Sequence, residues 1–194
     1  MTSREEPGCR DSYCCSDVCD ADSYCCLVEW DRLCVELAKQ LCLSASANDQ
    51  CQAPYGRGAI LVEADSVTFF ANTFATDSET DPGFCCRGDA PGSRGFGTVW
   101  FKFMATDTSA RISTCGSDPG RDSLINLFGV GDPTTEESAC ATLSMIACSD
   151  DMEDCGDGTH GLICVQGLEP GRTYYVMVAS KTAEQQGVYQ LEVR

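Results

Sequence analysis

The sequence predicts a mainly β protein, an antiparallel, jelly-roll-like β-sandwich preceded by a small, disulfide-rich α-helical N-terminal module. Two observations support this prediction. Apolar residues recur at a helical spacing in the first quarter of the chain, and afterwards they occur in short runs separated by Gly, Pro, Asp and Ser. No helical segment separates these runs, which is typical of an antiparallel sandwich rather than of an α/β sheet.

The sixteen cysteines divide the chain into two parts. The first set is Cys9, Cys14, Cys15, Cys19, Cys25, Cys26, Cys34 and Cys42, and the second is Cys51, Cys85, Cys86, Cys115, Cys140, Cys148, Cys155 and Cys164. Each set can close four disulfides without the other, as two independently folding units require. The prediction is therefore a cysteine-rich helical module at residues 1–44, a linker at residues 45–50 and a β-sandwich binding domain at residues 51–194.

Zinc or an iron–sulfur cluster is the alternative use of so many cysteines. Such sites need cysteine pairs separated by two residues, or histidine partners. No two cysteines have that spacing, and His160 is the only histidine. Structural disulfides are therefore favoured, and they place the folded protein in an oxidising compartment. The first residues are too polar for a signal peptide, so we expect an extracellular protein whose leader is absent from this sequence.

The first module is predicted to be helical. One apolar position recurs every four residues, at Cys26, Trp30, Cys34, Ala38 and Cys42. This spacing predicts one helix with a cysteine-lined face, capped by Asp22 or Ser23. A shorter helical turn is expected over residues 11–19. Two short helices bury little surface, so the disulfides, at roughly 2 to 4 kcal/mol each, supply much of the stability.

The second module contains nine runs with the composition of β-strands. They span residues 58–64, 66–74, 97–105, 110–115, 123–130, 141–148, 161–167, 172–180 and 187–193. Alternation places Val99, Phe101 and Phe103 on one face of their strand, and it places Tyr174, Val176 and Val178 on one face of theirs. The two tryptophans, Trp30 and Trp100, are expected in the core.

The formal net charge of −17 and the isoelectric point near 4.2 argue against nucleic acid or an anionic membrane as a partner, because both are polyanions. An acidic surface also keeps an extracellular protein soluble and monomeric, which is the simpler interpretation of this charge. No apolar run approaches the roughly 20 residues that span a bilayer, so no membrane insertion is expected.

Two resemblances follow from short motifs. Cys9 to Cys42, with its paired cysteines and DADSYCCLVEWDRLCVELAKQLC, resembles a cysteine-rich module of secreted planctomycete proteins. Residues 48–194 resemble the bacterial pre-peptidase C-terminal domain family through NDQC, GTVWFKF, ISTC, DSLINLF, IACSDD, LEPGRTYYVMVAS and VYQLEV. The second resemblance implies a β-sandwich appended to secreted enzymes, similar to calcium-dependent collagen-binding and carbohydrate-binding modules, although no peptidase or glycosidase domain lies beside it here.

A calcium site is expected in the acidic segment SDDMEDCGDG. Calcium prefers six to eight oxygen ligands, and this segment offers carboxylates with two glycines for tight turns. The resemblance implies that Asp122 lies near Asp150 and Asp151. The predicted ligands are Asp122, Asp150, Asp151, Asp154 and Asp157. The spacing is not that of an EF-hand, and the alternative is that these aspartates form turns and cap backbone amides.

Other candidate sites are weaker. A serine triad needs a histidine base, and His160 lies in a turn-like stretch where a surface position is expected. Because the cysteine count is even, no free thiol is expected for a cysteine nucleophile. The tripeptide at residues 87–89, Arg-Gly-Asp, is expected to be an ordinary turn. Exposed contacts are expected of aromatic residues in loop-like stretches, namely Tyr55, Phe74, Phe84 and Phe96.

The sequence therefore favours a non-enzymatic function. We expect a secreted binding or attachment module that recognises an extracellular polymer, either a polysaccharide or a protein surface, with calcium as its only expected cofactor. The alternative is a structural subunit of an extracellular filament, sheath or matrix that associates with itself, since many disulfides suit a protein that must resist proteases.

Overall fold

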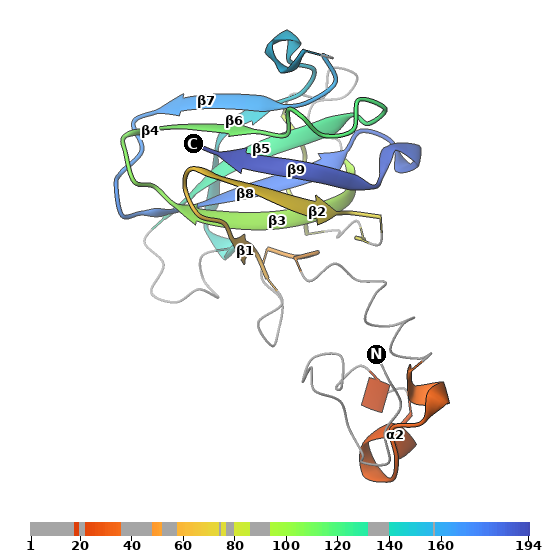
Figure 1. The fold of residues 1–194 in the computed structure, drawn as a ribbon. Helices are drawn as coiled ribbons and strands as arrows, with labels where there is room; N and C mark the ends of the chain where they lie inside the picture. The colour runs from red at the N-terminus through yellow and green to blue at the C-terminus, as the bar shows by residue number, and fades with distance from the viewer. Residues whose placement is uncertain are drawn as a thin grey trace. The chain divides into compact units, whose positions relative to one another are not determined.

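A computed structural model describes most of the chain, and its β-sandwich confirms the predicted fold class. The described residues are 18–19, 22–35, 48–51, 58–73, 75–76, 80–85, 94–131, 140–156 and 158–194. The chain divides into two compact units, Met1–Ser46 and Ala47–Arg194, which are described separately below (Figure 1). Among the described residues, no helix is both long enough and apolar enough to cross a membrane.

In the first unit, the single long helix predicted from the apolar spacing is interrupted within the described residues. α2 spans Tyr24–Leu27, and helical structure resumes at residues 32–35, the last of this unit that the structure describes. Ser23 occupies the N-cap position of α2 without a side-chain hydrogen bond, while Asp22 Oδ1 accepts a hydrogen bond of 3.0 Å from the Tyr24 amide. The predicted helix is wrong around Val28, where the chain turns. Most of the turn expected over residues 11–19 lies outside the described residues.

The disulfides of this unit explain why the helix breaks. Cys25 pairs with Cys34, and Cys19 pairs with Cys26. The Cα atoms of Cys25 and Cys34 lie 5.6 Å apart, whereas residues nine positions apart in an uninterrupted helix are separated by about 13 Å. A disulfide cannot span that distance. Around these bonds a small core contains Trp30, which is 2% exposed, so its predicted core position is confirmed.

The second unit consists of two packed sheets (Figure 1). The strands are β1 (Ile60–Leu61), β2 (Ser66–Ala71), β3 (Phe96–Met104), β4 (Ser109–Ser113), β5 (Ser123–Val130), β6 (Leu143–Ser149), β7 (Leu162–Gln166), β8 (Thr173–Ser180) and β9 (Val188–Val193). One sheet has the order β1-β3-β8-β5-β6, and the other has the order β2-β9-β4-β7. All pairs are antiparallel except β1 with β3, which is parallel and only two residues long.

The main core lies between the sheets. Phe101 and Phe103 of β3 and Val176 of β8 point into it, and each is at most 1% exposed. Ile112 of β4 and Leu191 of β9 meet them from the four-stranded sheet. The alternation predicted for β3 and β8 is therefore confirmed.

A second apolar layer covers the other face of the five-stranded sheet. Trp100 and Met177, whose neighbours along the strands face the main core, pack there with Phe84. Phe84 and Ala59 come from segments outside the sheets, so loops rather than a third sheet close this layer. The Trp100 indole N–H donates a hydrogen bond of 3.1 Å to Asp81 Oδ1. The predicted core position of Trp100 is confirmed, while Phe84 is buried rather than available for contact.

In the second unit, the described residues form three disulfides. They join Cys51 to Cys140, Cys85 to Cys148 and Cys115 to Cys155, across 89, 63 and 40 residues. No disulfide among the described residues joins the two units, and the five that are described indicate folding in an oxidising environment. Cys164 departs from the expectation, because it is an exposed free thiol that pairs with no described cysteine.

Candidate functional site

Three of the predicted metal ligands meet at one end of the five-stranded sheet. Asp122 precedes β5, and Asp150 and Asp151 follow β6. Because β5 is antiparallel to β6, the start of β5 lies beside the end of β6. One carboxylate oxygen from each of the three aspartates lies within 4.8 Å of the others. The strand register thus assembles an acidic cluster from residues 28 positions apart.

A lysine that the sequence analysis did not single out occupies the centre of this cluster. Lys181 follows β8, which is also antiparallel to β5 and ends at the same place. Its Nζ lies 2.6 Å from Asp151 Oδ2, 3.2 Å from Asp150 Oδ2 and 3.5 Å from Asp122 Oδ2. The Lys181 amide also donates a hydrogen bond of 3.1 Å to the Asp122 carbonyl oxygen. We call these four residues the Asp–Lys cluster.

Burial and charge shift the pKa values in the Asp–Lys cluster. Burial raises the pKa of Asp122 from 3.8 to about 6, against the attraction of Lys181, and it also raises the pKa of Asp150. Burial alone would lower the pKa of Lys181, but hydrogen bonds from its ammonium to Asp151 and Asp150 and the nearby negative charges raise it instead. The lysine is therefore firmly charged, and its ammonium group partly neutralises the three acids.

The remaining predicted ligands do not join the cluster in the described structure. Asp154 lies in the short helix η2 (Glu153–Cys155), is exposed and is not one of the three grouped aspartates. Asp157 lies outside the described residues. Cys155 ties this segment to Cys115, and Cys148 pairs with Cys85. The calcium prediction stays a prediction, and its expected centre is where the Lys181 ammonium lies.

The only histidine is buried, contrary to the expected surface position. His160 is 0% exposed, and its Nδ1 lies 3.2 Å from Ser123 Oγ. Ser123 Oγ in turn lies 2.6 Å from Thr114 Oγ1. Both hydroxyl groups are inaccessible to solvent, as is the ring. This arrangement links β5 to the segments after β4 and before β7, which is a structural role.

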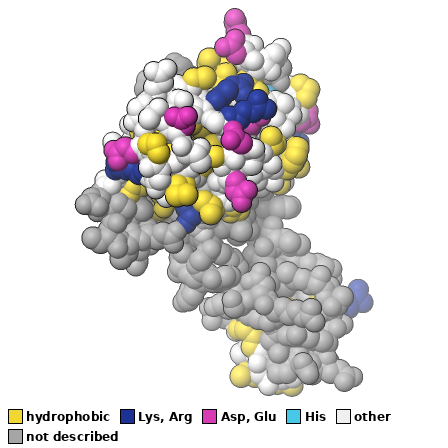
Figure 2. Space-filling view, turned by 60° about the vertical axis from the view of Figure 1, so that its left-hand side comes forward, with side chains coloured by type: hydrophobic (Ala, Val, Ile, Leu, Met, Phe, Trp, Pro, Cys, Tyr) yellow, Lys and Arg dark blue, Asp and Glu magenta, His cyan; other side chains and the backbone are white. Residues whose placement is uncertain are grey.

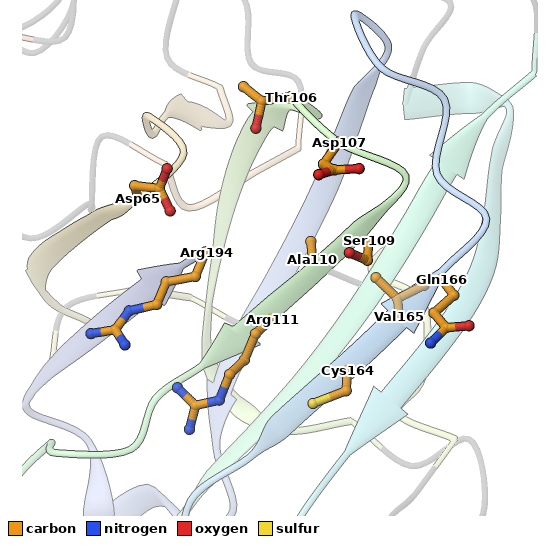
Figure 3. A pocket seen from close by; sticks show the side chains of 10 residues that line it. All are labelled: Asp65, Thr106, Asp107, Ser109, Ala110, Arg111, Cys164, Val165, Gln166 and Arg194. Atoms are coloured by element: carbon orange, nitrogen blue, oxygen red, sulfur yellow. The ribbon is translucent and has the colours of Figure 1, made fainter.

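A second candidate site is a groove of about 640 Å³ on the outer face of the four-stranded sheet, lined by β4, β7 and the end of β9 (Figure 3). The lining residues are Asp65, Thr106, Asp107, Ser109, Ala110, Arg111, Cys164, Val165, Gln166 and Arg194. Ser109 pairs with Gln166, and Arg111 pairs with Cys164, so alternation along β4 and β7 points all four side chains outward. The groove is mostly polar, with both signs of charge.

Glu192 holds the two groove arginines in position. Its carboxylate lies 2.8 Å from Arg111 Nη1 and 2.7 Å from Arg194 Nη2. Glu192 is 8% exposed, whereas the arginines are substantially exposed. The backbones of Arg111 and Arg194 also exchange hydrogen bonds of 2.6 and 2.8 Å. The two guanidinium groups are therefore fixed side by side, each with donors still directed to solvent.

The same face of the four-stranded sheet carries exposed apolar side chains. Phe70 packs edge-on against Phe101 in the core, with ring centroids 4.9 Å apart, so alternation directs Phe69 outward. Phe69 is 72% exposed, and Val67 and Val188 are 46% and 56% exposed. Figure 2 shows one face of the molecule, on which Lys and Arg side chains gather with Asp and Glu side chains close by.

Of the four aromatic residues expected to make exposed contacts, two are described, and neither of these is exposed. Phe84 is buried, and Phe96 is half-buried at the start of β3. Tyr55, Phe74 and the Arg-Gly-Asp tripeptide at residues 87–89 lie outside the described residues. Phe69 was missed because its run reads Val-Thr-Phe-Phe, and sequence alone does not say which of two adjacent phenylalanines faces the core.

These features define the second unit as a β-sandwich with an ion-pair cluster at one end and a polar groove on one sheet. Residues 5–46 match the model of a family described as a domain of unknown function (DUF8252). No curated protein matches the chain. Among solved structures, the chain is similar to the pre-peptidase C-terminal domain of collagenase from Bacillus anthracis, with 17% identity, a TM-score of 0.41, and coverage of 70% of this chain and 94% of that chain.

Proposed function

We propose that this chain is a secreted, non-catalytic binding module whose β-sandwich holds an extracellular polysaccharide in the groove beside Arg111 and Arg194. The groove itself is the observation that carries the proposal. Its volume of about 640 Å³ lies within the range of roughly 300–1,000 Å³ that is usual for ligand sites. Its floor is formed by β4 and β7, and strands hold side chains more precisely than loops do.

The chemistry of the groove matches a polyhydroxyl chain. Sugar hydroxyl groups both donate and accept hydrogen bonds, and the groove supplies partners for both. Arg111 and Arg194 are donors, Asp65 and Asp107 are acceptors, and Gln166 is both. The exposed ring of Phe69 on the same face offers an apolar surface against which a sugar ring can stack.

Pre-organisation supports the same proposal. Glu192 already holds both guanidinium groups, so binding does not need to immobilise two flexible side chains. An overall charge of −17 favours a neutral or cationic polysaccharide over an anionic one, because a polyanion would be repelled at long range.

Affinity electrophoresis and calorimetry on a panel of neutral, cationic and anionic polysaccharides test the proposal. We expect binding to at least one neutral or cationic polymer, and Gln166→Ala and Arg194→Ala each to weaken it about ten-fold, the value of one charged or well-made hydrogen bond. Asp154→Asn, an exposed position outside the groove, is the matched control and keeps full affinity. Affinity that is unaffected by both groove variants would refute the groove as the binding site.

A specific observation also favours the structural alternative. β2 is an edge strand of its sheet, and it exposes Val67 and Phe69 on the same face as Val188 of the neighbouring β9. An exposed, apolar edge is a template for pairing with a second copy. Analytical ultracentrifugation separates the two proposals. Concentration-dependent association that Val67→Lys abolishes supports a self-assembling subunit, whereas a monomer at every concentration leaves the binding module.

A further inference from the structure

We infer that Lys181 is the resident cation of the Asp–Lys cluster and that its ammonium group, rather than a metal ion, holds this end of the sandwich together. The inference is independent of the proposed function, because the cluster and the groove use different residues. It concerns the position that the sequence analysis assigned to calcium.

The first observation is the position of the ammonium group. The three aspartate oxygens lie within 4.8 Å of one another, which is the arrangement that would surround one cation. Lys181 Nζ already lies between 2.6 and 3.5 Å from one oxygen of each aspartate. A calcium ion would need its ligand oxygens at about 2.3–2.6 Å, so it would have to displace the lysine.

The lysine is anchored from its backbone as well as from its side chain. Its amide donates to the carbonyl of Asp122, the residue that carries one of the three carboxylates. Ser180, the residue before it, is fully buried, and its Oγ accepts a hydrogen bond of 2.9 Å from Asn72 and lies 2.8 Å from the Tyr189 hydroxyl. The last residue of β8 is thus fixed, and it directs Lys181 toward the acids.

The backbone of Asp151 gives a third, separate indication. Asp151 has a φ of 41°, in the left-handed region that side-chain-bearing residues rarely adopt. In this conformation its Oδ2 makes the shortest contact in the cluster, 2.6 Å from Lys181 Nζ. Aspartate tolerates this region better than most residues, and the turn after β6 thereby brings the Asp151 carboxylate to Lys181.

The number of ligand groups suits an ammonium group better than it suits calcium. Among the described residues, the group of three aspartates supplies only carboxylates, and one of them, Asp151, is half exposed. Asp122 Oδ1 is buried and accepts no hydrogen bond within the described structure, so the ammonium group reaches only the other oxygen of this carboxylate. Calcium prefers six to eight oxygen ligands, whereas an ammonium group has three donors, the same number as the aspartates around it.

Thermal unfolding with and without calcium tests the inference. The full chain is measured in EDTA and in millimolar calcium chloride. The melting temperature of the wild type is expected to be the same in both, whereas Lys181→Met is expected to lose roughly 5 °C in EDTA, because three neighbouring carboxylates are left without a cation. Calcium is expected to restore part of that loss, since the vacated position is then open to it.

Two further variants make the outcome specific. Lys181→Arg keeps the positive charge and is expected to retain most of the stability and the indifference to calcium. Asp154→Asn changes an exposed acid outside the cluster and is expected to change neither. A wild-type melting temperature that rises in calcium would overturn the inference, as would a Lys181→Met variant as stable as the wild type or indifferent to calcium.

Discussion

At the scale of single residues, the acidic end of the sandwich depends on compensation of charge. Three aspartates converge there because the strands that precede and follow them end together. Lys181 offsets part of their repulsion, but one positive charge does not balance three negative ones. In Asp122, burial raises the pKa to about 6 against the attraction of Lys181, and the charges of Asp151 and Asp150 add smaller contributions.

The raised pKa of Asp122 predicts a pH dependence of stability. The folded state binds this proton more tightly than the unfolded chain, whose pKa is 3.8. The contribution is therefore fully present below pH 3.8 and is lost as the pH rises through about 6. Between pH 7 and pH 5 the wild type should gain about 1 kcal/mol relative to Asp122→Asn. Chemical denaturation of both proteins at the two pH values measures the difference, and an unchanged difference would contradict the assignment.

The free thiol gives a second prediction at this scale. Cys164 is exposed, so it should react with N-ethylmaleimide in the native protein without reductant, whereas the described disulfide cysteines should not. Cys164→Ser should change stability by no more than about 0.5 kcal/mol, because an exposed side chain is replaced by one of similar size. Peptide mapping after alkylation identifies the modified cysteine. Recovery of the Cys164 peptide in disulfide linkage to another peptide would contradict this prediction.

Glu192 gives a third prediction at the scale of single residues. It is nearly buried between Arg111 and Arg194, and Glu192→Ala should destabilise the sandwich by about 1 kcal/mol, since the pair partners are themselves substantially exposed. The same variant should weaken polysaccharide binding, because the guanidinium groups lose their fixed positions. Urea unfolding and calorimetry measure the two effects, and Glu169→Ala, which removes an exposed ion pair with Arg172, is the control. Full polysaccharide affinity in Glu192→Ala would contradict the positioning role.

At the scale of elements, the strands could be predicted well and the helix could not. Each of the nine predicted runs overlaps an observed strand, because alternating apolar residues indicate a half-buried strand directly. β1 is much shorter than predicted, because only Ile60–Leu61 of the run at residues 58–64 form a strand. The helical prediction failed because disulfide connectivity, which the cysteine spacing does not specify, bends the chain back between Cys25 and Cys34.

The two candidate sites were likewise predictable only in part. The acidic segment was evident from composition, but Lys181 was not, since only the register of β5 with β8 brings it to Asp122. The arginines of the groove come from β4 and from the end of β9, 83 positions apart in the chain. His160 was placed on the surface because its neighbours are glycine and threonine, yet the sheets enclose it.

The outer apolar layer leads to a prediction for its disulfide. Cys51–Cys140 closes the longest loop among the described disulfides, 89 residues, and both cysteines pack against this layer. Cys51→Ser/Cys140→Ser should cost about 4.6 kcal/mol by the loop-entropy estimate. It should also shift the fluorescence of Trp100 to longer wavelength, measured in a Trp30→Phe background so that one indole reports. An unshifted spectrum would show that the layer stays closed without this bond, and Cys115→Ser/Cys155→Ser, outside the layer, is the control.

At the scale of the whole molecule, the three central strands of the five-stranded sheet, β3, β8 and β5, are buried on both faces, although the sandwich has only two sheets. One face packs against the four-stranded sheet, and the other is closed by loops that bring Ala59 and Phe84 onto Trp100. Cys51–Cys140 and Cys85–Cys148 tether those loops. Disulfide bonds thus keep the outer face covered, as a further layer of secondary structure does in larger proteins.

Because disulfides hold this face closed, the conditions of expression decide whether the chain can fold. In a reducing cytoplasm these two disulfides would not form. The face of the sheet that bears Trp100 and Met177 would then be an exposed apolar surface that promotes aggregation. Recombinant material from a reducing cytoplasm is expected to collect in inclusion bodies.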